Sequence, residues 1–147
     1  MPKAVFDSTV IVSAILTPTG LAGELIKRAK TGEFVLALSQ EIIDEARATL
    51  RTHKKLRQQY RYSDEEVAYF FSGLRNFVTI VSDLPIIQIV RDPNDDFIIA
   101  TAIKANADYL VTHDKDLLTL GSHETIRIIT PKVFLQILQN QSQEEPQ

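Results

Sequence analysis

Short apolar runs alternate along this chain with longer segments whose apolar residues recur at helical spacing. The runs at 3–6, 34–38 and 109–112 are rich in β-branched, aliphatic and aromatic residues, which favours strands. Between them, apolar residues stand three and four positions apart, as in amphipathic helices. Strands that alternate with helices of this length form a parallel sheet with helices on both faces. We therefore expect an α/β fold, a three-layer α/β/α sandwich around a central parallel sheet.

Capping residues predict several of the helix boundaries. Ser39 can cap a helix that has acidic residues near its start, and Ser63 with Glu66 matches a capping box. Thr130 before Pro131 is typical of a helix start. We expect helices within 10–16, 21–31, 40–50, 64–74, 97–105 and 131–138, a short turn at 117–120, and extended segments at 78–81, 86–90 and 126–129.

The chain has 147 residues, of which 44% are hydrophobic and 24% charged, which fits one globular domain. We expect that domain to span 1–138 and to be followed by a polar, disordered tail at 139–147. The absence of cysteine excludes disulfides, thiolate metal sites and a cysteine nucleophile. No apolar run approaches the roughly 20 residues that span a bilayer, and no secretion signal is recognisable. We therefore expect a cytoplasmic protein with no membrane partner.

The net charge of −3 argues against tight non-specific binding of nucleic acid, which usually needs a basic surface. One segment departs from this balance, because 47–61 contains six cations and no acid. It can be an edge that steers phosphates toward an acidic site, or an ordinary solvated helix end and loop. Both interpretations stay open for its basic residues Arg47, Arg51, Lys54, Lys55, Arg57 and Arg61.

Acidic residues follow several of the predicted strands. Ligands of open parallel sheets bind beyond the carboxyl ends of the strands, so these acids should meet at one rim. Glu45 lies about one and a half turns into the helix after the second strand, at the edge of its buried face. The acids at the strand-to-helix junctions are Asp7, then Asp92, Asp95 and Asp96, then Asp114 and Asp116.

The three junctions and Glu45 would bring at least four negative charges to one place, and these charges repel one another. A hard divalent cation such as Mg²⁺ or Mn²⁺ compensates that repulsion. Such a cation activates water and stabilises charge on a phosphodiester. The three histidines lack metal-ligand spacing, and the five glycines form no phosphate-binding loop. Each acid alone has a structural explanation as a helix cap or a surface residue. Their joint placement at successive strand ends favours a site.

Four stretches of the sequence resemble the PIN domain, in particular the toxin branch of VapC-like ribonucleases from toxin–antitoxin pairs. The resemblance runs from about Lys3 to Leu138. It rests on the order and spacing of 5–14, 38–45, 92–100 and 107–118. It implies a Mg²⁺- or Mn²⁺-dependent endoribonuclease that cleaves RNA, forms a homodimer and is inhibited by a cognate antitoxin.

The resemblance also assigns roles to individual residues. Asp95 is preferred over Asp96 because 100–102 then aligns with the small-residue helix of related toxins. Thr9 stands where the family usually has Asn; it can still hydrogen-bond Asp7 or a bound water, but it lacks the amide. The implied catalytic acids are Asp7, Glu45, Asp95 and Asp114; the implied metal ligands are Asp7, Asp95, Asp114 and Asp116; the supporting residues are Thr9, Asp92, Asp96 and Thr112.

Three other functions compete with this one. A haloacid-dehalogenase-type phosphatase needs a second Asp two residues after the first, where this chain has Thr9. A receiver domain needs paired acids after the first strand, and only Asp7 is there. A catalytically weak or inactive PIN-like module that binds RNA or docks to a protein stays open, because of Thr9 and the acidic net charge.

Overall fold

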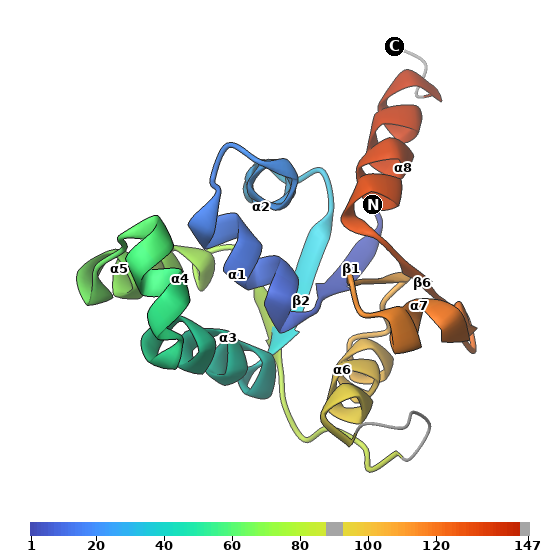
Figure 1. Ribbon diagram of the computed structural model, residues 1–147. Helices are drawn as coiled ribbons and strands as arrows, with labels where there is room; N and C mark the ends of the chain where they lie inside the picture. The colour runs from blue at the N-terminus through green and yellow to red at the C-terminus, as the bar shows by residue number, and fades with distance from the viewer. Residues whose placement is uncertain (88–92, 145–147) are drawn as a thin grey trace.

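The computed structural model describes residues 1–87 and 93–144, without the side chains of 93–95 and 142–144. Along these residues one to three helices separate successive strands, except for β5 and β6, which follow one another (Figure 1). The strands are β1 (Lys3–Phe6), β2 (Val35–Ser39), β3 (Thr79–Val81), β4 (Tyr109–Val111), β5 (Ser122–His123) and β6 (Ile126–Ile129). The helices are α1 (Ser8–Leu16), α2 (Leu21–Lys30), α3 (Gln40–Thr52), α4 (Lys54–Tyr60), α5 (Asp64–Leu74), α6 (Pro93–Lys104), α7 (Lys115–Leu120) and α8 (Pro131–Glu144).

The strands form one sheet in the order β3-β2-β1-β4-β6-β5. All neighbouring pairs are parallel except β5 and β6, which form a short antiparallel edge. The predicted α/β fold with a central parallel sheet is therefore confirmed, with the addition of β5. That strand has only two residues, Ser122 and His123, too few to produce an alternating pattern in the sequence.

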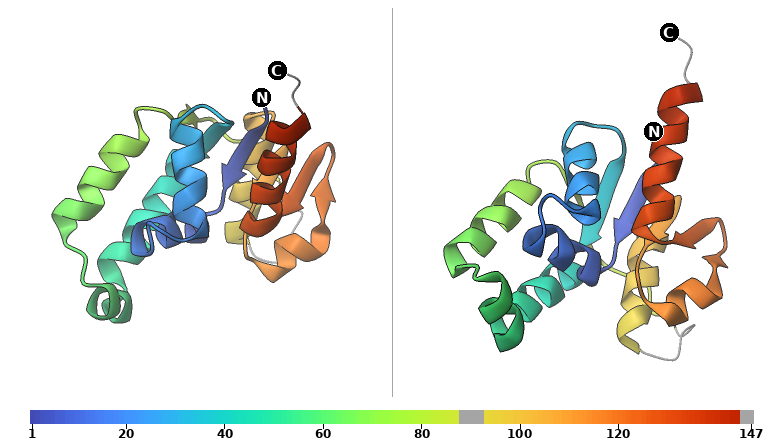
Figure 2. Two further views of the ribbon diagram at one scale, coloured as in Figure 1. Left: turned by 90° about the horizontal axis from the view of Figure 1, so that it is seen from above. Right: turned by 45° about the horizontal axis from the view of Figure 1, so that its top comes forward.

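The direction of winding places the helices on both faces of the sheet. From β1 the chain proceeds outward through β2 to β3, and α6 then returns it across the sheet to β4. Because parallel crossovers are right-handed, a reversal of direction moves the connecting helix to the opposite face. Figure 2 shows α2 and α8 on one side and α6 on the other, which confirms the three layers. The reversal lies between β1 and β4, where open α/β sheets bind their ligands.

An aromatic cluster joins α8 to the central strands. Phe34 and Phe134 meet edge to face with ring centroids 4.8 Å apart, and Phe6 lies 6.1 Å from Phe134. Tyr109 on β4 packs against the same Phe134 ring, with centroids 5.5 Å apart. Edge-to-face pairs suit the aromatic quadrupole and add to the burial of apolar area. This cluster fixes the last helix against the two strands whose ends form the candidate site.

Most predicted boundaries agree with the structure, and two segments differ. Ser39 caps α3 and accepts a hydrogen bond from the Ile42 N–H, and the capping box of Ser63 and Glu66 is present. Thr130 Oγ1 likewise accepts from the Val133 N–H at the start of α8. The segment expected to be a helix end and loop contains the separate helix α4, and α8 continues through the predicted tail to Glu144.

The segment expected to be extended at 86–90 lies partly outside the described residues, since 88–92 are not described. Residues 86–87 belong to no strand. In the described part of the chain, no single helix is long and apolar enough to cross a membrane. Only α1 and α2 taken together pass that test, and they are bent by 99° relative to each other.

Candidate functional site

Asp7 follows β1 directly and lies at the point where the winding of the sheet reverses. Its N–H donates to the Val111 carbonyl on neighbouring β4 over 3.0 Å, which continues the ladder by one residue. Its side chain is only 4% exposed and caps α1, since Oδ1 accepts from the Thr9 N–H. A buried carboxylate is unusual unless hydrogen bonds or a cation stabilise its charge. The predicted placement of Asp7 at a strand end is thus matched by the structure.

Thr112 connects the ends of β1 and β4. Its side chain is fully buried, and Oγ1 donates to Asp7 Oδ2 over 2.7 Å. The same oxygen accepts from the Asp114 N–H over 3.0 Å. One hydroxyl therefore fixes both the buried carboxylate and the backbone that carries the next acid.

Ser8 connects Asp7 to Glu45. Its hydroxyl oxygen lies 3.0 Å from Glu45 Oε1 and 3.3 Å from Asp7 Oδ1, and the side chain is 3% exposed. Two carboxylates from β1 and α3 thus meet around one buried hydroxyl, although Glu45 itself is an exposed residue. Ser8 was not among the residues predicted from the sequence. The available signal was a polar residue between a strand-terminal Asp and the apolar run at 10–12.

The other predicted residues at the ends of β1 and β4 are Asp114, Asp116 and Thr9. Asp114 is half-buried and caps α7, because Oδ1 accepts from the Leu117 N–H over 3.0 Å. Asp116 is exposed in the first turn of the same helix. Thr9 is exposed, and the hydrogen bond that it gives to Asp7 comes from its backbone N–H.

The acids that precede α6 are only partly described. Asp92 lies outside the described residues, and Asp95 contributes backbone to the first turn of α6 while its side chain lies outside them. Asp96 is described and 9% exposed. A buried hydroxyl pair anchors α6 beside the end of β2, since Thr101 Oγ1 lies 2.9 Å from Ser39 Oγ.

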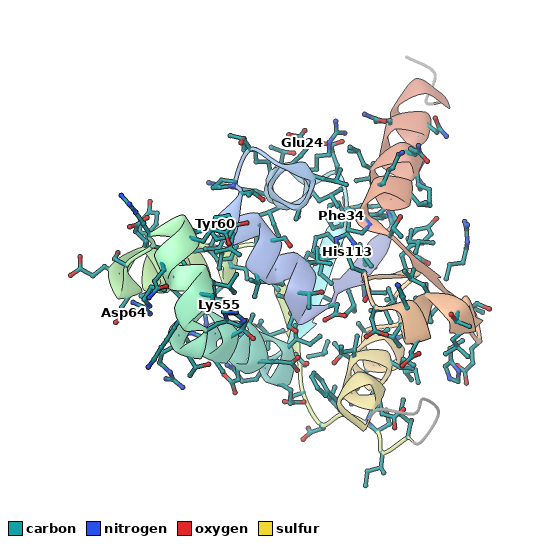
Figure 3. The ribbon with its side chains drawn as sticks, in the orientation of Figure 1. Glu24, Phe34, Lys55, Tyr60, Asp64 and His113 are labelled. Atoms are coloured by element: carbon teal, nitrogen blue, oxygen red, sulfur yellow. The ribbon has the colours of Figure 1, made fainter. Side chains whose placement is uncertain are left out.

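Two arginines of the basic segment 47–61 contact neighbouring side chains, and its four other cations are exposed. Arg57 donates to Asp64 over 2.6 Å, and this hydrogen bond raises the pKa of Arg57. Arg47 lies over the Phe71 ring, 5.3 Å from its centroid. Figure 3 shows Lys55 on the side of α4 toward α1, and Asp64 at the outer edge of the molecule. Arg51, Lys54, Lys55 and Arg61 are exposed and available to an anionic ligand.

The donor set suits a hard cation, although the described side chains do not form a complete site. Among the described residues, no group of three or more His, Asp or Glu side chains is placed to hold a metal ion. Mg²⁺ usually retains several waters and takes only one or two carboxylates from the protein. Asp7 and Glu45, both oxygen donors at one hydroxyl, fit that requirement. The structure thus brings together two acids of the predicted quartet and places the Asp114 backbone beside them.

Comparisons with known proteins identify the family of the chain. The PIN domain family model matches residues 3–116, a span that runs from β1 into α7 and includes Asp7, Glu45 and Asp114. The chain is also 24% identical over 142 residues to uncharacterized protein MJ1680 of Methanocaldococcus jannaschii, and the match covers 91% of this chain and 90% of that protein. The chain belongs to the PIN domain family, whose members are generally nucleases.

Proposed function

We propose that the chain is a Mg²⁺- or Mn²⁺-dependent endoribonuclease that hydrolyses RNA phosphodiester bonds. The observation that carries the proposal is the pair of carboxylates, Asp7 and Glu45, held around the Ser8 hydroxyl where the winding of the sheet reverses. Two like charges at one hydroxyl repel each other, and a divalent cation offsets that repulsion.

The residues that would hold the cation are Asp7 and Glu45, with Asp95, Asp114 and Asp116 as the further acids of the proposed site. A bound Mg²⁺ or Mn²⁺ would supply an activated water and stabilise negative charge on the phosphate. The chain's own part is to fix the carboxylates. The Thr112 hydroxyl and the Thr9 N–H hold the Asp7 carboxylate in one orientation, which limits the conformational freedom that it would lose on binding a cation.

The substrate side of the proposal rests on the charge along α3 and α4. Glu45 lies on α3, and the exposed Arg51 lies later on that helix, followed by Lys54 and Lys55 on α4. Cations next to an acidic site attract a polyanion that the net charge of −3 would otherwise repel. We propose that RNA approaches along this edge.

Metal binding is the first test. At 100-fold over the dissociation constant, Mg²⁺ or Mn²⁺ should stabilise the fold by about 2.7 kcal/mol, measured as a rise in melting temperature. No shift with either metal would contradict the proposal.

Cleavage of a labelled single-stranded RNA is the second test. Asp95→Asn should abolish Mg²⁺-dependent cleavage while the circular dichroism spectrum stays unchanged. Asp44→Asn removes an exposed carboxylate from α3 and serves as the control of equal charge. Retained cleavage by Asp95→Asn would refute the role given to Asp95, and Asp96→Asn then tests the neighbouring acid.

We further propose that the chain is the toxin of a toxin–antitoxin pair and acts as a homodimer. Expression should then arrest growth, and co-expression of the product of the adjacent open reading frame should restore it. A catalytically weak PIN-like module that binds RNA or docks to a protein is the second candidate. The exposed Thr9 side chain, in place of the usual Asn, favours it.

A further inference from the structure

We propose that Ser8 is a positioning residue that holds the Glu45 carboxylate beside Asp7, an inference that rests on the proposed function. The geometry that points to it is the buried Ser8 hydroxyl, 3.0 Å from Glu45 Oε1 and 3.3 Å from Asp7 Oδ1. The contact with Glu45 joins residues 37 positions apart in sequence and connects the start of α1 to α3.

Ser8 and Glu45 differ in how firmly the fold fixes them. Ser8 is the first residue of α1, directly after the cap Asp7, and is 3% exposed. The position of its oxygen depends on one side-chain torsion, and burial restricts that torsion. Glu45 is exposed on α3 and has three side-chain torsions, whose ordering costs conformational entropy. A hydrogen bond from a fixed donor offsets part of that cost.

The Ser8 hydroxyl has a single hydrogen to donate, and the distances favour Glu45 over Asp7 as its acceptor. A serine hydroxyl has one hydrogen, so two carboxylates compete for it, and Glu45 is the nearer. Asp7 has other donors, since Oδ1 accepts from the Thr9 N–H and Oδ2 from Thr112 Oγ1. Loss of the Ser8 hydroxyl removes this hydrogen bond from Glu45, while Asp7 keeps both of these donors.

Kinetics of RNA cleavage test this role. A hydrogen bond to a charged group contributes about 1.5–3 kcal/mol, so Ser8→Ala should lower kcat at least about tenfold and leave KM for RNA unchanged. Ser8→Thr keeps the hydroxyl and should retain most of the activity. The control is Ser13→Ala, a half-buried serine on the same helix, which should match the wild type.

A double-mutant cycle shows whether Ser8 acts through Glu45. In a Glu45→Ala background, Ser8→Ala should change the residual rate by less than about twofold, because the group that it positions is gone. An equal loss of rate in both backgrounds would overturn the proposal. Wild-type rate in Ser8→Ala would overturn it as well.

Urea unfolding without metal supplies a readout that does not depend on activity. The shifts of the unfolding midpoint caused by Ser8→Ala and Glu45→Ala should be non-additive, because the two side chains share one interaction. Additive shifts would overturn the interaction between them and with it the proposal. A wild-type chain that cleaves no RNA with either metal would refute the proposed function alone, and the unfolding cycle would still decide whether Ser8 holds Glu45.

Discussion

Replacing Thr112 with Val tests how the ends of β1 and β4 hold the buried carboxylate. Valine has nearly the volume of threonine, so the change removes the hydroxyl and leaves no cavity. That hydroxyl donates to Asp7 Oδ2 over 2.7 Å and accepts the Asp114 N–H over 3.0 Å. A hydrogen bond to a charged group is worth about 1.5–3 kcal/mol, and the part-buried Asp114 N–H, left without its acceptor, adds up to about 1 kcal/mol. We therefore expect the free energy of unfolding to fall by about 2–4 kcal/mol.

Urea denaturation followed by circular dichroism, in the presence of a metal chelator, measures this loss. A lower midpoint with an unchanged slope would show that stability alone has changed. Thr119→Val is the matched control, because Thr119 is exposed on α7 and should shift stability by less than about 0.5 kcal/mol. If Thr112→Val also stays within that margin, the hydroxyl does not hold the two strand ends, and Asp7 must be stabilised by other groups.

Three further predictions concern packing and charge. Gly23→Ala should destabilise the fold by about 1–3 kcal/mol in urea, because a Cβ there would lie 2.0 Å from the Pro18 carbonyl oxygen. Gly73→Ala, where a Cβ meets open space on α5, should instead be neutral or stabilise by up to about 1 kcal/mol. If both variants lowered the free energy of unfolding, or both raised it, this explanation would be contradicted. Phe134→Ala should cost about 3–5 kcal/mol, measured by thermal unfolding, since it removes the ring on which Phe6, Phe34 and Tyr109 converge; a loss below about 1 kcal/mol would show that the cluster does not anchor α8. Neutralising Lys54 and Lys55 should weaken RNA binding and reduce the slope of log K against log salt by about 0.7 for each phosphate that the variant no longer neutralises. The corresponding change of Lys27 and Lys30, on α2, should leave that slope unaltered.

The layers of the fold could be predicted from the sequence because buried strands and amphipathic helices leave different periodicities. The strand order could not, since Asp7 and Asp114 become neighbours only through the pairing of β1 with β4. Helix α4 was missed because Lys54–Tyr60 contains only two apolar residues, Leu56 and Tyr60, too few to indicate a helix by periodicity. Its lysine, arginine and glutamine residues are nevertheless good helix formers.

The candidate site was predicted as a set of acids, and the structure adds the hydroxyls that hold them. Thr112 was expected near the site, and its hydrogen bonds with Asp7 and the Asp114 N–H give that expectation a geometry. Ser8 was missed because a serine at a helix start is usually a local cap, whereas its partner Glu45 is distant in sequence. Contacts over such separations depend on how α1 packs against α3, which local patterns do not encode.

The hydroxyl pair of Ser39 and Thr101 has a consequence for the dynamics of the molecule. Ser39 caps α3, which carries Glu45, while it also contacts Thr101 on α6, the helix that begins with the other proposed acids. Both hydroxyls are fully buried, so neither helix can open there without breaking its hydrogen bond to the other. Helices α3 and α6 should thus open as one cooperative unit, so that a change which lowers the amide exchange protection of one helix also lowers that of the other.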